Sequence, residues 1–265
     1  MTQPLALITG GTSGIGAAYA ALLAESGYNL ILIGRRERQL TAVCDKLTTQ
    51  YAVSAEPMLT DLSVASEREA LVQRIASLPR LDVLINNAGY SKDGLYGDVS
   101  WAEQKALLDV HVQATCELSH AALPLLLAQK GTLINVASVA SWLPTPHTAL
   151  YGPTKAFIRS FSETLALGYG RQGLSVQALS PGFTVTDFHE KLGIAPEKFY
   201  RSTGILRAWS PERVVRKSWR DVQRGRIVSI PGWNYRLIVM LLRHIPMRLM
   251  HWVMKRSTIA RFGAD

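Results

Sequence analysis

The segment Leu5-Ala6-Leu7-Ile8-Thr9-Gly10-Gly11-Thr12-Ser13-Gly14-Ile15-Gly16 decides the fold. It opens on an apolar run of strand length, and the alanine-rich stretch 17–23 that follows the glycines favours a helix. A strand, a glycine turn and a helix in this order are the context in which a glycine fingerprint binds a dinucleotide. Small residues let the backbone approach a pyrophosphate, and the helix N-terminus supplies free N–H groups and a partial positive charge. We therefore predict contacts to the cofactor from Gly10, Thr12, Ser13, Gly14, Ile15 and Gly16.

Beyond this segment, strand-like and helical segments alternate, which favours a mostly parallel sheet with helices on both faces. Pro153 lacks an N–H group and fits only the first turn of a helix, so the helix that contains it should begin near Leu150. The expected strands are 28–34, 52–59, 81–86, 131–137, 174–180 and a short seventh at 227–230, and the clearest helices are 67–78, 101–128 and 154–169.

Length and composition fit one globular domain. The chain has 265 residues, 48% of them hydrophobic, which suits a single α/β domain with a sizeable core. Cys44 and Cys116 fit neither a disulfide framework nor a metal site, so no bound metal is expected. No apolar run reaches the length of a membrane span and no signal peptide is recognisable, so we predict a cytoplasmic protein.

The net charge of +9 is unevenly distributed. Residues 1–195 carry 14 Lys/Arg and 16 Asp/Glu, whereas residues 196–265 carry 15 and 4. All of the excess positive charge therefore lies in the last 70 residues, where it would attract anionic partners. No nucleic-acid-binding module is recognisable, so we expect no nucleic-acid partner.

Tyr151 and Lys155 lie four residues apart, and Ser138 precedes the tyrosine by thirteen residues. Positions i and i+4 share one face of a helix, so a phenol and an ammonium group can act on one substrate atom. A free tyrosine has a pKa of about 10, and a neighbouring cation lowers that value toward the neutral range. A serine at the end of the adjacent strand could hold the substrate oxygen beside the phenol.

The motifs together resemble the short-chain dehydrogenase/reductase family over roughly the first 190 residues. The resemblance implies a single-domain Rossmann fold and a nicotinamide-dependent interconversion of an alcohol and a carbonyl compound. It makes Tyr151 the general acid/base, Lys155 the group that lowers the tyrosine's pKa and binds the nicotinamide ribose, and Ser138 the group that orients the reacting oxygen. The match rests on Thr9-Gly10-x-x-x-Gly14-x-Gly16, Asp61-Leu62, Asn86-Asn87-Ala88-Gly89, Ser138, Tyr151-x-x-x-Lys155 and Pro181-Gly182.

The second predicted strand ends at Gly34-Arg35-Arg36. An acidic residue here would bind a ribose 2′-hydroxyl group, whereas the planar fork of an arginine suits a 2′-phosphate. We therefore predict NADP(H) as the cofactor, bound chiefly through Arg35, with Arg36 as the alternative. The resemblance adds adenine contacts from Asp61 and Leu62, a ribose contact from Asn87, and contacts on the nicotinamide side from Thr184 and Thr186.

His111 departs from the family pattern. In the family an asparagine follows the Asn-Asn-Ala-Gly motif on the next helix and helps to hold a water chain that reaches the lysine. Here the matching stretch is Leu108-Asp109-Val110-His111-Val112. An imidazole can also shuttle protons and has an unperturbed pKa of about 6.5, which would make activity sensitive to pH near neutrality. The sequence leaves open whether His111 is such a catalytic relay or a structural histidine.

Residues 184–210 are expected to form a lid over the substrate. Four aromatic residues of this segment, Phe188, Phe199, Tyr200 and Trp209, could contact the substrate. Trp142-Leu143-Pro144 would give the mouth of the site an apolar wall, which suits a lipophilic carbonyl compound or alcohol. His147 could line the same mouth or lie on the surface.

The C-terminal residues 233–265 read as a basic amphipathic extension of the domain formed by residues 1–232. Two helical stretches, 235–245 and 247–256, meet at Pro246, and Arg248, His251 and Lys255 share one face. The pattern fits an interfacial helix on anionic lipid, but it also fits a helix docked over the substrate pocket or against another subunit. An acidic carrier protein or a phosphorylated substrate could also meet this basic face.

These observations favour an NADP(H)-dependent oxidoreductase of a lipophilic ketone, aldehyde or secondary alcohol, assembled as a homodimer or homotetramer as is usual in the family. Two alternatives stay open. One is a nucleotide-binding scaffold of weak activity, which the histidine at position 111 would favour. The other is a protein of the membrane surface that acts mainly through its basic C-terminal extension.

Overall fold

The computed structural model describes residues 3–186, 204 and 206–262, without the side chains of 257 and 259–262. Seven strands form one sheet in the order β3-β2-β1-β4-β5-β6-β7, and every neighbouring pair is parallel. The strands are β1 (Leu5–Thr9), β2 (Asn29–Gly34), β3 (Ala55–Leu59), β4 (Val83–Asn86), β5 (Thr132–Val136), β6 (Ser175–Leu179) and β7 (Val228–Ser229). The predicted doubly wound Rossmann fold is confirmed.

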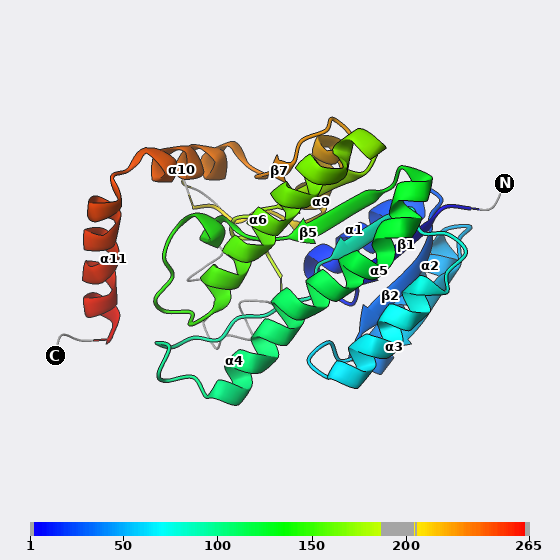
Figure 1. The fold of residues 1–265 in the computed structure, drawn as a ribbon, viewed down its shortest axis with the longest axis horizontal. Helices are drawn as coiled ribbons and strands as arrows, with labels where there is room; N and C mark the ends of the chain where they lie inside the picture. The colour runs from blue at the N-terminus through cyan, green and yellow to red at the C-terminus, as the bar shows by residue number, and fades with distance from the viewer. Residues whose placement is uncertain (1–2, 187–203, 205, 263–265) are drawn as a thin grey trace.

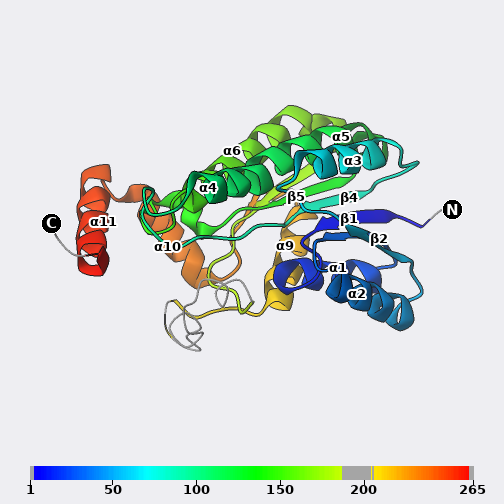
Figure 2. The same cartoon turned by 90° about the horizontal axis from the view of Figure 1, so that it is seen from below.

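Helices cover both faces of this sheet, as Figure 2 shows. Helices α1, α2 and α9 lie on one face, and α3, α4, α5 and α6 lie on the other. Their bounds are α1 (Gly14–Glu25), α2 (Glu37–Gln50), α3 (Ala65–Ala76), α4 (Trp101–Leu108), α5 (Ala114–Gln129), α6 (Tyr151–Tyr169) and α9 (Pro211–Val222), with short 3₁₀ turns η2 (Val139–Trp142) and η3 (Gly170–Gln172).

The strand order reverses between β1 and β4. The chain first builds from β1 outward to β3 and then returns to place β4 on the other side of β1. Ligands of doubly wound sheets bind in the crevice that such a reversal leaves at the carboxyl ends of the strands. The glycine turn follows β1 and the Asn-Asn-Ala-Gly motif follows β4, so both motifs lie at this crevice.

The region predicted as one helix over 101–128 contains a wider turn. A π-helical turn, η1 (Asp109–Gln113), joins α4 to α5 without a break. Single π-helical turns inside α-helices are rare and often mark functional sites. Here the turn carries His111, whose side chain is fully buried. Helix α6 begins at Tyr151, as the position of Pro153 predicted.

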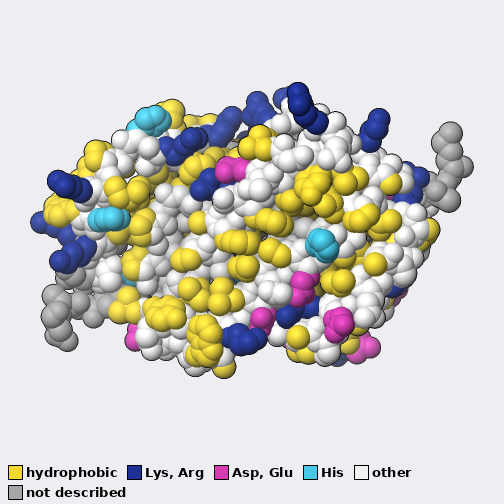
Figure 3. Space-filling model, viewed as in Figure 1, with side chains coloured by type: hydrophobic (Ala, Val, Ile, Leu, Met, Phe, Trp, Pro, Cys, Tyr) yellow, Lys and Arg dark blue, Asp and Glu magenta, His cyan; other side chains and the backbone are white. Residues whose placement is uncertain are grey.

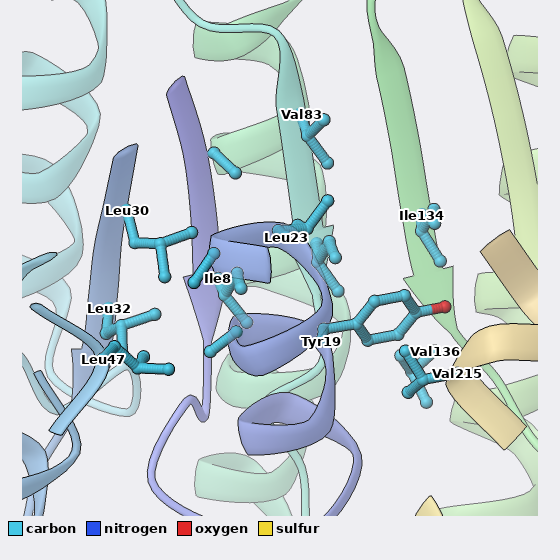
Figure 4. Close-up of a cluster of buried hydrophobic side chains, with 14 of the residues drawn as sticks. Ile8, Tyr19, Leu23, Leu30, Leu32, Leu47, Val83, Ile134, Val136 and Val215 are labelled. Atoms are coloured by element: carbon cyan, nitrogen blue, oxygen red, sulfur yellow. The ribbon is translucent and has the colours of Figure 1, made fainter. Parts of the chain in front are cut away.

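Two apolar clusters, one on each face of the sheet, form the core. Figure 4 shows the cluster between the sheet and α1, where Tyr19 reaches across from α1 toward Ile134, Val136 and Val215. The Tyr19 hydroxyl group donates a hydrogen bond to Ser218 of α9, so the ring fills apolar space while its polar tip keeps a partner. This packing fixes α1, and with it the glycine turn, against the sheet.

A buried amide network ties the centre of the sheet to the helices behind it. Asn86 of β4 donates to Asn135 of β5 at 2.9 Å and to Ser119 of α5 at 3.0 Å. Asn135 in turn donates to Ser162 of α6 at 3.0 Å. Paired polar groups in a core favour one arrangement, because a shift would break these hydrogen bonds at a cost of about 1–3 kcal/mol each. The network therefore sets where α6 lies relative to the strand ends.

Arg68 of α3 is a buried cation that joins three elements. Its guanidinium group donates to the Leu62 carbonyl at 2.9 Å and to Glu117 of α5 at 3.0 Å, and it lies 3.9 Å from Asp109 of η1. A buried charge needs such partners, since removing one of them leaves the charge uncompensated. Arg68 thus holds the loop after β3 against the π-helical turn that carries His111.

The C-terminal extension follows β7 as α10 (Trp233–His244) and α11 (Met247–Phe262). Figures 1 and 2 show α10 running along one end of the molecule and α11 standing beyond it, away from the sheet. Among the helices that the structure describes, none alone is long and apolar enough to cross a membrane. Only α10 taken together with residues 247–256 meets that criterion, and a 115° bend separates the two.

Candidate active site

A cavity of about 710 Å³ opens at the carboxyl ends of the strands. This volume lies in the usual range for small-molecule and cofactor sites. The cavity brings together almost all of the predicted site residues, although they come from seven separate segments of the chain. Its lining includes Gly10, Thr12, Ser13, Gly14, Ile15, Arg35, Arg36, Asp61, Leu62, Asn87, Ser138, Tyr151, Lys155, Thr184 and Thr186. Gly16 and His111 lie behind its wall.

The glycine turn is shaped for close backbone approach. A Cβ atom on Gly16 would lie 2.2 Å from the Gly10 carbonyl oxygen, so no larger residue fits there without moving the turn. Gly10 itself has φ +66°, a conformation that favours glycine. The Asn87 amide donates to the carbonyls of Thr9 at 2.9 Å and Gly10 at 3.1 Å, which braces the turn from β4. The cavity reaches this turn at the N-terminus of α1, where backbone N–H groups suit a pyrophosphate.

The two arginines after β2 have different partners. Arg36 donates to the hydroxyl groups of Thr12 at 2.7 Å and Ser13 at 3.2 Å, so it lies against the glycine turn. Arg35 is exposed and pairs with Asp61 at 3.6 Å. Burial alone would raise the pKa of Asp61, but hydrogen bonds from Ser63 and the Arg35 guanidinium group hold it below its usual value. Two arginines, one of them paired with Asp61, therefore line this end of the cavity.

Ser138, Tyr151 and Lys155 meet at the opposite end of the cavity. Ser138 follows β5, and its hydroxyl group is hydrogen-bonded to Tyr151. Lys155 lies one turn further along α6, with its Nζ atom 5.7 Å from the centre of the Tyr151 ring. The ammonium group donates to the Val136 carbonyl at 2.8 Å, which fixes it at the end of β5. The prediction that Tyr151 and Lys155 share one face of a helix is thus confirmed.

The electrostatics of this pair differ from the expectation. Burial raises the pKa of Tyr151, although the hydrogen bond with Ser138 opposes this shift. Burial also lowers the pKa of Lys155 to about 7, so the amine is only partly charged at neutral pH. The predicted lowering of the tyrosine's pKa by its lysine neighbour is therefore not seen in the protein alone. A partly charged amine attracts a phenolate less strongly than the expectation assumed.

His111 lies directly behind Tyr151 and Lys155. The Tyr90 backbone N–H group donates to Nε2 at 3.1 Å, so Nδ1 carries the ring hydrogen and donates to the Thr154 hydroxyl group at 2.8 Å. Thr154 then donates to the Tyr151 carbonyl at 2.8 Å. Burial, reinforced by the charge of Lys155, holds the pKa of His111 well below its ordinary value. Both ring nitrogens are thus occupied by structural partners.

The wall expected from Trp142-Leu143-Pro144 is only partly present. Leu143, Pro144 and His147 line the cavity, whereas Trp142 does not. The Trp142 ring instead packs beneath the guanidinium groups of Arg159 at 4.0 Å and Arg243 at 5.4 Å. Such cation–π contacts are a common use of an exposed indole face.

Only the two ends of the expected lid, residues 184–186 and 206–210, and residue 204 lie among the described residues. Trp209 lies outside the cavity, under Arg213 at 3.7 Å, and its predicted substrate contact stays a prediction. Phe188, Phe199 and Tyr200 fall outside the described residues. Thr186 lies against the glycine turn, since a Cβ atom on Gly14 would come within 2.8 Å of its methyl group.

Sequence reasoning missed the contribution of the C-terminal extension to the cavity. Tyr235, Ile238 and Leu242 of α10 and Met254 of α11 line it. Tyr235 packs flat on the Pro181-Gly182 turn, where a Cβ atom on Gly182 would lie 2.3 Å from its ring. The spacing of 235, 238 and 242 on one helix face could have indicated an inward stripe. In the part of the chain that the structure describes, no three His, Cys, Asp or Glu side chains group as metal ligands.

Comparison with known sequences supports one family. The family model for short chain dehydrogenases matches residues 4–196. An uncharacterized oxidoreductase of Staphylococcus epidermidis is 31% identical over 208 residues, which cover 78% of this chain and 89% of that protein. A very-long-chain 3-oxoacyl-CoA reductase of Anas platyrhynchos is 35% identical over 189 residues, which cover 68% of this chain and 60% of that protein.

Comparison with solved structures gives the same result. A short-chain dehydrogenase from Sphingobium yanoikuyae in complex with NADPH has a TM-score of 0.81 at 27% identity, covering 99% of this chain and 96% of that chain. A Beutenbergia cavernae protein with bound NADP at low occupancy has a TM-score of 0.79 at 26% identity, covering 88% and 97%. The crevice, the glycine turn and the matched sequence together show that the chain belongs to the short-chain dehydrogenase/reductase family of oxidoreductases.

Proposed function

We propose that the protein is an NADP(H)-dependent oxidoreductase that interconverts a lipophilic ketone or aldehyde and the corresponding alcohol. One observation carries the proposal. The side chains of Ser138, Tyr151 and Lys155 line the same cavity as the glycine turn and the two arginines after β2. A dinucleotide with its phosphates at the turn would therefore extend toward the phenol. The weak nucleotide-binding scaffold is disfavoured, because Ser138, Tyr151 and Lys155 all line the cavity.

The roles of the side chains follow from their contacts. The cofactor would supply the hydride. The Tyr151 hydroxyl group would give a proton to the carbonyl oxygen during reduction and take it back during oxidation. Ser138, already hydrogen-bonded to that hydroxyl group, would hold the substrate oxygen beside it. Lys155 would favour the phenolate in proportion to its own charge, and an anionic cofactor nearby would favour the charged amine.

We assign His111 a positioning role. Its two ring nitrogens bind the backbone of Tyr90 and the hydroxyl group of Thr154, and Thr154 holds the carbonyl of Tyr151. A neutral ring in this arrangement fixes the first turn of α6 and exchanges no proton in the neutral range. These contacts favour the structural alternative for His111 over the proton relay.

Preference for NADP(H) rests on the charge at the adenosine end. Arg35 and Arg36 both line the cavity, and no acidic residue occupies the end of β2. Arginine suits a 2′-phosphate because its planar fork can bind two oxygens. The relatives from Sphingobium and Beutenbergia, which bind NADPH and NADP, support this choice. An Arg35→Asp variant should shift kcat/KM toward NADH, and Arg38→Asp on the exposed side of α2 is the matched control.

A lipophilic substrate is inferred from the wall of the cavity near Tyr151. Leu143, Pro144, Ile238, Leu242 and Met254 give that end an apolar lining. The relative from Anas platyrhynchos, named for reduction of very-long-chain 3-oxoacyl-CoA, is consistent with a long apolar substrate. A panel of ketones and aldehydes of increasing chain length, followed by NADPH consumption, tests this inference. The panel also includes hydrophilic sugars, and turnover of the sugars alone would refute the inference.

The decisive experiment compares Tyr151→Phe with wild type. Turnover should fall by about 10²–10⁴-fold, the usual contribution of a general acid, while NADPH binding persists. Tyr169→Phe at the far end of α6 controls for loss of a tyrosine from the same helix. Equal turnover of wild type and Tyr151→Phe would instead support the scaffold.

Three features stay predictions. We propose that residues 1–232 form the cofactor-binding and catalytic unit, with a lid at 184–210, and that residues 233–265 extend it. The homodimer or homotetramer can be measured by sedimentation. The cytoplasmic location, with or without contact to a membrane, is a question for fractionation of cells.

A further inference from the structure

The C-terminal extension carries a large excess of positive charge. Between Asp221 and Asp265 the sequence contains eight Lys/Arg residues and no Asp or Glu. Among the described side chains of α10 and α11, five of these basic residues are exposed, namely Arg236, Arg243, Arg248, Lys255 and Arg256. Figure 3 shows Lys, Arg and His side chains interleaved with hydrophobic ones over this end of the molecule. Such a surface lacks the mixed charges that usually cover a helix facing water.

Helix α10 has two apolar faces rather than one. Its inward face lines the cavity through Tyr235, Ile238 and Leu242. Its outward face presents Trp233, which is 63% exposed, with Met240 and Leu241 about half exposed. Large apolar side chains on the solvent face of a helix are costly unless another surface covers them.

Helix α11 repeats this arrangement with a narrower inward face. Met250 is buried and Met254 reaches the cavity. Four further apolar side chains of α11 are about half exposed or more, namely Met247, Leu249, Trp252 and Val253. Arg256 packs over the Trp252 ring at 4.1 Å, which places a cation beside an exposed indole. We call the exposed apolar and basic side chains of α10 and α11 together the C-terminal surface.

The charge of this surface identifies what covers it. A twofold contact centred on this surface would bring its basic side chains opposite one another. Anionic lipid headgroups supply the missing negative charge, and the acyl region accepts the tryptophan, leucine and methionine side chains. A helix with basic and aromatic side chains around an apolar stripe is typical of one that lies in the membrane interface.

The same helices join this surface to the active site. Ile238, Leu242 and Met254 line the cavity that contains Tyr151, while their neighbours on the helices form the C-terminal surface. A lipophilic molecule dissolved in the bilayer would meet α10 and α11 before any other part of the site.

We propose that the C-terminal surface docks the enzyme on anionic membranes and that its substrate enters the cavity from the lipid. The second part rests on the proposed function, whereas the first part does not. Docking is electrostatic and apolar together, so it weakens with salt and with loss of either kind of side chain.

Flotation of the full-length protein tests the docking. Vesicles of phosphatidylcholine mixed with phosphatidylglycerol should carry the wild type upward, and phosphatidylcholine alone should not. The variant Arg248→Gln/Lys255→Gln/Arg256→Gln should bind about 100-fold more weakly, since each basic residue near an anionic surface contributes a factor of roughly five. The control Arg38→Gln/Lys46→Gln/Arg171→Gln removes three exposed charges elsewhere and should bind as wild type does.

The apolar contribution has its own pair of variants. Leu249→Ser/Trp252→Ser should reduce flotation at least about tenfold, given the apolar area involved. The control Trp101→Ser/Leu167→Ser removes two apolar side chains that are even more exposed, from α4 and α6, and should not reduce flotation. Equal flotation of all variants, or no flotation of the wild type, overturns the proposal. Sedimentation of the Leu249→Ser/Trp252→Ser variant tests a contact between two copies of the chain. If the wild type does not float and this variant changes from dimer to monomer, the proposal is likewise overturned.

A kinetic comparison separates failure of docking from failure of the proposed function. With a long-chain ketone carried in the vesicles, phosphatidylglycerol should raise the rate of NADPH consumption for the wild type but not for the Arg248/Lys255/Arg256 variant. With a short, water-soluble ketone the two should be equal. Turnover of the soluble ketone without any lipid effect leaves the proposed function intact and refutes entry from the membrane. Flotation without turnover of any carbonyl compound leaves docking intact and refutes the proposed function.

Discussion

Replacing Lys155 with methionine should make the free protein more stable at neutral pH while it abolishes turnover. Burial lowers the pKa of Lys155 to about 7, whereas an unfolded lysine has a pKa of about 10.4. Between these values the unfolded chain binds more protons than the native protein, so the native lysine site gains stability as pH rises. Folding at neutral pH must therefore either remove the proton from Lys155 or bury its positive charge.

The magnitude follows from the two pKa values. Each pH unit between them changes the free energy of unfolding by about 1.4 kcal/mol, so about three units correspond to roughly 4 kcal/mol. Methionine removes this penalty but also removes the hydrogen bond to the Val136 carbonyl, at a cost of about 1–3 kcal/mol. The variant should thus exceed the wild type by about 1–3 kcal/mol near pH 7 and fall below it near pH 10.

Urea denaturation of the cofactor-free protein across this pH range measures the effect. The informative quantity is the difference in free energy of unfolding between wild type and Lys155→Met, because other titrating groups cancel in it. Lys46→Met, at an exposed position of α2, controls for the change of residue type. A difference that stays constant from about pH 7 to about pH 10 would refute the reasoning.

Three further changes have defined outcomes. Gly16→Ala would bring a Cβ atom within 2.2 Å of the Gly10 carbonyl, so NADPH affinity in a fluorescence titration should fall at least about tenfold, and wild-type affinity would contradict the tight turn. His111→Asn should reduce the fall in the free energy of unfolding below about pH 6.5, because an unfolded histidine binds a proton there while the native ring, with its lowered pKa, does not. If the variant kept a slope of about 1.4 kcal/mol per pH unit, His111 would not be the cause. Tyr235→Phe loses the hydrogen bond to the Arg207 carbonyl at 3.0 Å, so the free energy of unfolding should drop by about 1 kcal/mol, and an unchanged urea midpoint would exclude this contribution.

The fold was predictable because its strongest signals are local. The apolar run before Thr9, the glycines up to Gly16 and the alanine-rich stretch that follows specify a strand, a turn and a helix without help from the rest of the chain. Parallel strands then place the residues after each strand at one edge of the sheet. For this reason Asn87 and Ser138, which follow β4 and β5, could be assigned to the same site as the turn.

The remaining features depend on contacts that no local pattern encodes. The raised pKa of Tyr151 results from burial, which depends on how the loops and α10 close over the strand ends. Trp142 is of a residue type that often lines pockets, but Arg159 and Arg243 from other elements cover its ring. The hydrogen-bond partners of His111 come from Tyr90 and α6, far from it in sequence, so its role was undecidable from its neighbours.

The guanidinium group of Arg68 has a consequence for how this sequence can change. It joins the Leu62 carbonyl at the adenosine end of the cavity to Glu117 and Asp109 on the helix that carries His111. Substitutions at these positions should therefore be epistatic: replacing an acidic partner leaves the buried Arg68 guanidinium group less compensated, whereas a concerted exchange for apolar residues of similar volume can be neutral. Directed evolution of this enzyme would have to vary positions 68, 109 and 117 as one block, since single-site libraries at any of them will discard viable combinations.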